Sequence, residues 1–155
     1  MKNLPLNKKI LINRLAEIEA DCQELSQFQK ISLKEFKKSY DYAIAEHFLR
    51  RALEAVFDLS SHIISRIPLR PGERPEGYKT IAIALGKHKI IPKSFAEGPL
   101  LQMAGYRNRM VHFYQEITNE ELYQIIKEDL GDLEKFCSFV KKLIETPEKF
   151  GFEIK

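Results

Sequence analysis

The sequence predicts an all-α protein, an up-and-down helical bundle of about five helices. Two observations lead to this prediction. Apolar residues recur at alternating spacings of three and four in most of the chain, the period of one face of a helix. Prolines and glycines cluster between residues 67 and 77, where they predict a loop. We therefore expect residues 1–155 to form one helical domain around one core, with no second module.

The first two helices are predicted from their apolar faces and from a helix-start signal. One face of a helix over residues 7–26 carries Leu11, Leu15, Ile18, Cys22 and Leu25. Ser32 with Glu35 three residues later forms a capping box. A long helix should begin there and run to Arg66, because no glycine or proline interrupts it. We expect it to be the central helix, with an apolar surface formed by Tyr40, Ile44, Phe48, Leu49, Ala52, Val56, Leu59 and Ile63.

The second half of the chain predicts three further helices. Residues 78–86 form a short helix ending at a glycine; their alternation of Ile with Ala also fits a strand, but a lone strand would have no partner. Pro99 is expected in the first turn of a fourth helix, where its missing N–H costs little. Thr118 and Glu121 form a second capping box. They begin a long final helix with the apolar stripe Leu122, Ile126, Leu130, Leu133, Phe136, Val140 and Leu143.

Composition limits the classes of function and the location of the protein. Lys and Arg total 25 against 22 Asp and Glu, so the net charge of +3 is too small to indicate a nucleic-acid binder, and any basic surface must be local. Cys22 and Cys137 lie far apart, outside any CxxC or Cys/His cluster, so we predict neither a disulfide framework nor a metal site. No run of about 18 apolar residues occurs. We expect a cytoplasmic protein.

The densest polar cluster is the segment RNRMVHFY, residues 107–114. Arg107 and His112 are five residues apart, so on a continuous helix they would point in different directions. Either the helix ends before His112 and the chain bends the imidazole back, or a cleft forms between two protomers that each contribute both residues. Asn108 lies four residues before His112. If the helix persists, this amide shares a face with the imidazole and can orient it.

The segment MAGYRNRMVHFY resembles the signature of the HEPN superfamily, and specifically of HepT-like toxins: Arg, four residues, His, one residue, Tyr. Arg107, His112 and Tyr114 match this pattern. The resemblance extends to YDYAIAEHFLRRALEAVFDLSSHII and to ITNEELYQIIKEDLGDLEKF, so it covers most of the chain in the expected order. Two features of this chain depart from the family pattern: Pro99 beside Gly98, just before the motif, and the proline-rich loop. The resemblance implies a HEPN-type bundle that forms a homodimer.

The same resemblance implies a metal-independent endoribonuclease without a cofactor, the toxin of a type VII HEPN/MNT toxin-antitoxin pair. The chemistry is consistent with these residues, because RNA carries its own nucleophile, the 2′-hydroxyl, and needs only positioning, proton transfer and charge stabilisation. An imidazole such as that of His112 transfers protons near neutral pH. The planar guanidinium of Arg107 matches two phosphate oxygens. These are the two expected catalytic residues.

The resemblance also implies a partner, an MntA-like nucleotidyltransferase antitoxin that transfers AMP to the motif tyrosine, Tyr114. The added bulk and charge would exclude RNA from the cleft. Arg109 is a candidate contact for RNA phosphate, and Arg50 and Arg51 are lower-ranked ones. The alternative function is a non-catalytic HEPN module that docks a nucleotidyltransferase or binds a nucleotide. A purely structural dimerisation bundle ranks last, since it gives no reason for the polar cluster.

Overall fold

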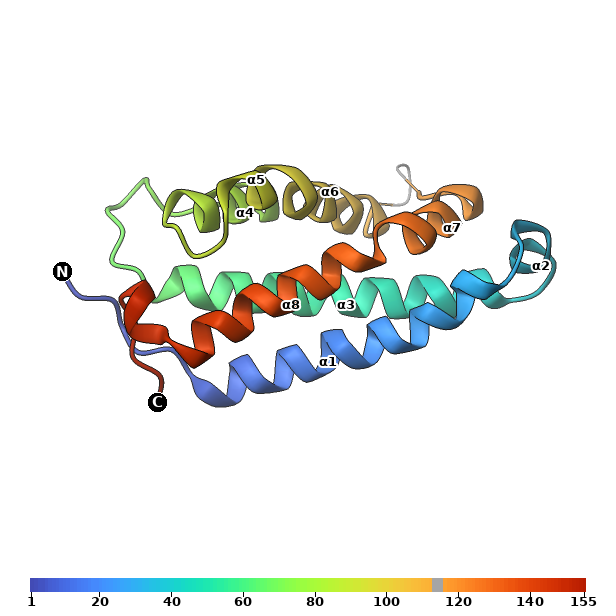
Figure 1. Ribbon diagram of the computed structural model, residues 1–155. Coiled ribbons are helices and arrows are strands. Elements are labelled where there is room, and N and C mark those ends of the chain that lie inside the picture. Colours follow the sequence, from blue (N-terminus) through green and yellow to red (C-terminus); the bar gives the residue numbers. More distant parts are fainter. Residues whose placement is uncertain (113–115) are drawn as a thin grey trace.

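The computed structural model describes residues 1–112 and 116–155, which form an elongated helical bundle (Figure 1). One layer contains α1 (Lys8–Ser26), α3 (Asp41–Ser65) and α8 (Leu130–Glu145). A second layer, lying over α3, contains α4 (Tyr78–Lys87), α5 (Lys93–Phe95) and α6 (Leu101–Met110). The short α2 (Leu33–Lys38) and α7 (Asn119–Glu128) lie at the end far from the two termini. The all-α prediction is confirmed, including helix rather than strand at residues 78–86.

The first helix follows its prediction closely. Asn7 caps it by accepting a hydrogen bond from the Ile10 N–H at 3.1 Å. The predicted apolar face is buried, and the buried hydrophobic residues of the chain form one continuous core. The Asn7 N–H donates to Nε2 of His62 at 2.9 Å, which ties the start of α1 to the end of α3.

No helix in the described ranges is long and apolar enough to cross a bilayer.

The predicted central helix is interrupted, so the expectation of one helix from Ser32 to Arg66 is wrong. Ser32 does cap a helix, accepting from the Glu35 N–H at 3.2 Å, but that helix is the short α2. Ser39 is extended (φ −104°, ψ −177°), and its hydroxyl accepts from the Asp41 N–H at 3.3 Å, where α3 begins. A serine side chain thus offers the backbone an alternative to helix. Tyr40 is left 79% exposed rather than in the core.

From Asp41 onward the prediction of a central helix is confirmed. α3 packs against α1 along its length and also contacts α2, α4, α6 and α7. Most of the apolar positions expected on it are buried, whereas Ile44, near its start, is 45% exposed. α3 is therefore the element against which α1, α2, α4, α6 and α7 are positioned, whereas α8 packs against α1.

Pro99 does not begin a helix, which corrects the prediction for the motif helix. α5 continues through the π-helical turn η2 (Ala96–Leu100) directly into α6, so the helical segment starts at Lys93. Within an α-helix a proline lacks one donor and its ring clashes with the carbonyl four residues earlier. The wider π turn, with its i to i+5 pattern, accommodates Pro99 in the middle of the segment.

Gly86 does not end α4, contrary to prediction, but allows two helices to approach closely. α4 continues to Lys87, and the chain turns at Lys89, which adopts a left-handed backbone conformation with φ 59°. A Cβ built at Gly86 would lie 2.8 Å from the Cβ of Ala96, closer than such atoms approach in real proteins. Glycine at this position is therefore required by the packing of α4 against the turn after α5.

The predicted final helix is divided by Asp129, which lies between α7 and α8, and the two helices run in different directions (Figure 1). Half of the predicted capping box is present: the Thr118 hydroxyl accepts from the Glu121 N–H at 3.1 Å, whereas both Glu121 carboxylate oxygens accept from Arg109 rather than from the Thr118 N–H. The apolar stripe is also confirmed, since all seven predicted residues are buried. The pattern identified the buried face but not the bend.

Gly86→Ala is expected to destabilise the protein by about 1–3 kcal/mol, because the added methyl group overpacks the α4–α5 contact. The free energy of unfolding, measured by urea denaturation, tests this. Gly131→Ala is the matched control: a Cβ there meets nothing within 4 Å, and alanine is the better helix former. The close packing would be disproved if Gly86→Ala were as stable as the wild type.

Candidate active site

The motif residues lie at the C-terminal end of α6. The helix ends at Met110, with Val111 as its C-cap, so it ends before His112 as the first of the two predicted geometries requires. His112 is exposed, and its backbone N–H donates to the Arg109 carbonyl at 3.3 Å. Asn108 was expected to share a helical face with His112 only if the helix continued to His112. It does not continue, so the two residues do not lie on one face of α6. Tyr114 lies outside the described residues.

Arg107 is held by contacts from two other helices. Its Nε donates to the Glu54 carboxylate of α3 at 2.9 Å. Its guanidinium carbon lies 4.3 Å from the centroid of the Tyr78 ring at the start of α4, a cation–π contact. The Arg107 side chain is only 20% exposed, so water screens these contacts less than at an open surface. Glu54 accepts its hydrogen bond from Nε. The two Nη atoms of a guanidinium form another pair of donors, which can bind two oxygens of a phosphate.

Neither Glu54 nor Tyr78, the residues that hold Arg107, was predicted from the sequence. Glu54 is 53 positions away from Arg107 in the chain, and Tyr78 is the first residue of a helix after the proline-rich loop. No spacing rule connects positions so far apart. The sequence offered no signal for this pairing, because Arg50 and Arg51, one helical turn before Glu54, are the partners that spacing suggests for its carboxylate.

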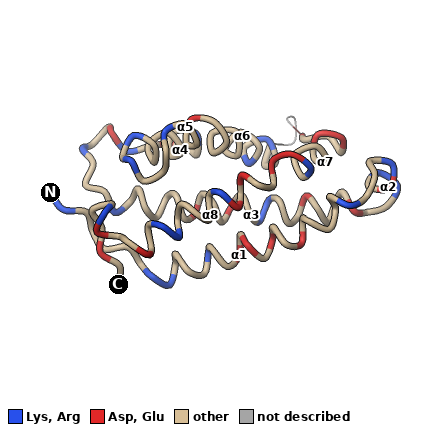
Figure 2. The backbone as a smooth tube through the Cα atoms, viewed as in Figure 1, with Lys and Arg blue, Asp and Glu red and all other residues tan. Residues whose placement is uncertain are grey.

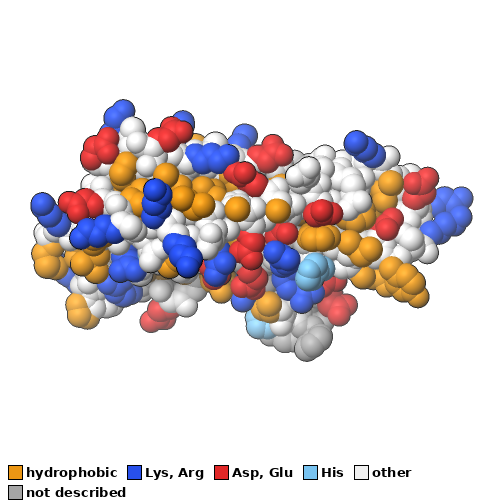
Figure 3. Space-filling view, turned by 90° about the horizontal axis from the view of Figure 1, so that it is seen from below, with side chains coloured by type: hydrophobic (Ala, Val, Ile, Leu, Met, Phe, Trp, Pro, Cys, Tyr) orange, Lys and Arg blue, Asp and Glu red, His pale blue; other side chains and the backbone are white. Residues whose placement is uncertain are grey.

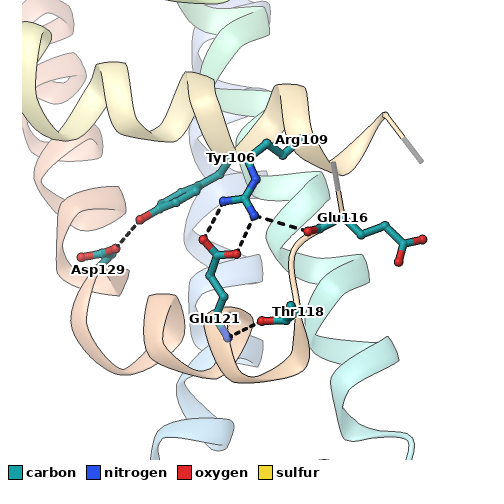
Figure 4. A network of polar contacts seen from close by, with 6 residues as sticks. All are labelled: Tyr106, Arg109, Glu116, Thr118, Glu121 and Asp129. Atoms are coloured by element: carbon teal, nitrogen blue, oxygen red, sulfur yellow. Dashed lines mark hydrogen bonds and ion pairs between the residues drawn. The ribbon is translucent and has the colours of Figure 1, made fainter. Parts of the chain in front are cut away.

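Arg109 points to α7 and forms a bidentate ion pair with Glu121 there (Figure 4). Its two Nη atoms donate to the two carboxylate oxygens of Glu121 at 2.6 and 2.7 Å, and Nη2 also donates to the Glu116 carbonyl at 3.3 Å. These hydrogen bonds lower the pKa of the Glu121 carboxyl below its ordinary value. Arg109 therefore joins α6 to α7, and its expected contact with RNA phosphate remains a prediction.

Tyr106 makes a third contact from the same turn (Figure 4). Its hydroxyl donates to the Asp129 carboxylate at 3.0 Å, at the bend between α7 and α8. Burial and then this hydrogen bond raise the pKa of Tyr106 well above its ordinary value, so the phenol remains protonated and a donor near neutral pH. Three side chains thus connect the end of α6 to three different places in the bundle.

The surface near Glu54 carries charges of both signs. A groove of about 350 Å³ there is lined by Arg14, Glu17, His47, Arg50, Arg51, Glu54, Ala55 and Asp58. Its arginines are paired with acids, as Arg50 is with Glu46 at 2.8 Å. On the face seen in Figure 3, basic and acidic side chains likewise stand side by side, with histidine among them. This surface is not a continuous basic patch. The phosphate contacts expected of Arg50 and Arg51 remain predictions.

The profile of the family described as "HepT-like: Ribonuclease HepT-like" matches residues 18–140, most of the chain and all of α6. The chain belongs to the HepT-like ribonuclease family. The HEPN resemblance inferred from the motif is therefore confirmed. Within the described residues of this HepT-like chain, no group of three or more His, Cys, Asp or Glu side chains is placed to hold a metal ion.

Two curated proteins and one solved structure illustrate the similarity. The tRNA nuclease HepT of Aphanizomenon flos-aquae is 30% identical over 141 residues, which cover 90% of this chain and 93% of that protein. The mRNA nuclease HepT of Shewanella oneidensis is 27% identical over 135 residues, covering 85% and 96%. The tri-AMPylated HEPN toxin of Shewanella oneidensis, solved with its MNT antitoxin, superimposes with a TM-score of 0.73 at 24% identity, covering 86% and 97%. That likeness shows the HEPN fold.

Glu121→Gln is expected to lower stability at neutral pH by about 0.5–1 kcal/mol, a modest amount because the ion pair is partly exposed. The Arg109 contact lowers the pKa of Glu121. The ion pair therefore contributes fully to the free energy of unfolding above the ordinary pKa of about 4.3, and this contribution is lost as the pH falls through the lowered pKa. Urea unfolding of both proteins should therefore differ at neutral pH and converge in acid. A difference that stayed constant with pH would contradict this role, and Glu145→Gln, an exposed glutamate of α8, serves as control.

Proposed function

We propose that this protein is an endoribonuclease that cleaves RNA without a metal, with Arg107 and His112 as its catalytic residues. The main support is their placement at one helix end: a guanidinium anchored from α3 and α4, and an exposed histidine just beyond the last turn of α6. Membership of the HepT-like ribonuclease family and the nuclease activity named for two relatives support the same reaction.

The proposed step is attack by the 2′-oxygen of the RNA on its own adjacent phosphorus. A bond forms between the 2′-oxygen and phosphorus while the bond from phosphorus to the 5′-oxygen breaks. The proton leaves the 2′-hydroxyl for an imidazole, and the 5′-oxygen receives a proton from an imidazolium. Arg107 stabilises the charge on the phosphoryl oxygens. The products are a 2′,3′-cyclic phosphate and a 5′-hydroxyl.

A homodimer would supply both proton-transfer groups, because one chain contributes one His112 and the reaction uses a base and an acid. In the proposed dimer, each protomer presents the end of its α6 to a shared cleft. We further propose that the partner is a nucleotidyltransferase antitoxin that silences the toxin by transferring AMP to Tyr114. A solved relative of this fold is an AMPylated HEPN toxin bound to an MNT antitoxin, which supports that partnership.

A non-catalytic binding module remains the second candidate, and one contact favours it. The Arg107 guanidinium is paired with Glu54, so its charge is already partly balanced before any phosphate binds. If the protein is an RNase, the scissile phosphate must bind the Nη atoms of Arg107 although Glu54 already balances part of the guanidinium charge.

RNA cleavage in EDTA tests the nuclease proposal. The wild type should cut RNA, and Arg107→Ala and His112→Ala should each lose about a hundredfold to ten-thousandfold of the rate. Arg70→Ala and His88→Ala are matched controls, since both residues lie outside α6 and outside the contacts that hold Arg107, and they should leave the rate unchanged. Cleavage at wild-type rate by the motif variants would point to a contaminating nuclease and refute the assignment.

Modification of Tyr114 is tested by incubating the protein with the partner nucleotidyltransferase and ATP, followed by peptide mass spectrometry. The expected result is AMP on the peptide that contains Tyr114, and a Tyr114→Phe protein that keeps its activity in the presence of the partner. Tyr40→Phe is the control, because Tyr40 is the most exposed described tyrosine at 79% and should not matter. AMP found only on another residue would exclude Tyr114 as the switch.

A further inference from the structure

An apolar groove of about 720 Å³ runs between the α4–α5 corner and α8, with no role in the proposed cleavage. One bank is the end of α4 and the start of α5, and the other is α8 with the short helix η4 (Pro147–Phe150). Its apolar lining consists of Ile83, Ile90, Ile91, Pro92, Phe139 and Phe150. The groove lies at the opposite end of the ten-residue α4 from Tyr78, hence about 15 Å from the Arg107 contact.

Lysines surround this groove on both banks. Lys87, Lys89 and Lys93 lie on the α4–α5 side, and Lys142 lies on α8. Glu97 is the acidic residue among the lining side chains, so four lysines less one glutamate leave a local charge of +3. Figure 2 shows basic positions gathered where α4 ends and α5 begins. This groove therefore carries an excess of positive charge, unlike the groove next to Glu54, where acids match the arginines.

The groove is built by unusual local structure. Lys89 holds a left-handed backbone conformation, which costs a residue with a side chain roughly 1 kcal/mol or more. The close approach at Gly86 brings α4 and α5 together to form one bank. Ile83 remains 41% exposed, although the same helix buries its other face well. An apolar surface ringed by charges is typical of a site for another molecule.

We propose that this groove docks an acidic amphipathic helix of a partner protein. Apolar side chains at positions i, i+3 or i+4, and i+7 of that helix would fill the isoleucine-lined floor, and its flanking Asp and Glu would pair with the lysines. Charge complementarity selects the partner, since three lysines on the α4–α5 bank and Lys142 on the α8 bank favour acids on both flanks of the apolar stripe. A nucleic acid fits less well: bases stack on open aromatic faces, whereas the floor is mainly aliphatic and Phe139 packs against Phe95 at 5.0 Å.

The test uses a fluorescein-labelled amphipathic peptide of about 15 residues, with Leu at i, i+3, i+7 and i+11, Glu at the positions that flank this stripe, and Ala, the best helix former, elsewhere. Fluorescence anisotropy with the intact protein should show binding that weakens as salt is added. Lys87→Glu with Lys142→Glu should lower the affinity at least tenfold, and Ile83→Ser, at a position that is 41% exposed, should also weaken it. Lys34→Glu with Lys38→Glu, an equal charge change on α2, should not.

A peptide with the same Leu positions but Lys in place of Glu should not bind, and neither should a single-stranded RNA oligonucleotide at this groove. The proposal is overturned if the acidic peptide fails to bind, or if it binds equally well to the α4/α8 and α2 charge-reversal variants. It is also overturned if the oligonucleotide, and not the peptide, loses affinity in the Lys87/Lys142 variant, since the groove would then be a nucleic-acid surface.

Discussion

The position of the motif depends on how the last turn of α6 is anchored. Within five residues of sequence, three side chains reach three different elements: Arg107 to Glu54 on α3, Arg109 to Glu121 on α7, and Tyr106 to Asp129 at the bend before α8. Because these contacts point in different directions, the end of α6 cannot slide or rotate without losing at least one. Such anchoring is what a catalytic pair needs, since small displacements of reacting groups cost large factors in rate.

The two candidate sites are separated along one helix. α4 begins at Tyr78, which packs under the Arg107 guanidinium, and ends near the groove lysines. A molecule in the groove would therefore leave the surface around Arg107 open, yet it would contact the same helix that supports Arg107. If both proposals hold, binding of a protein partner and cleavage of RNA would involve opposite ends of α4, so that neither would block the other.

Much of the fold could be predicted because amphipathic stripes and caps are local signals. The buried faces of α1 and of α7 with α8 follow from spacing alone, and Thr118 caps its helix as expected. The failures were also local in origin: Ser39 stops a helix without glycine or proline, and a π turn admits Pro99. The support of Arg107 by Glu54 could not be predicted, because it depends on tertiary packing between distant positions.

The kinetics of Glu54 variants test most directly whether that contact positions a catalytic arginine. Glu54→Ala should lower kcat of RNA cleavage by about tenfold to a hundredfold while KM stays the same or falls, because Arg107 keeps its charge but loses its orientation. Glu54→Gln, which keeps an oxygen able to accept from Nε, should recover most of the rate. A Glu54→Ala protein that cleaves RNA with the kcat of the wild type would contradict this account of the site.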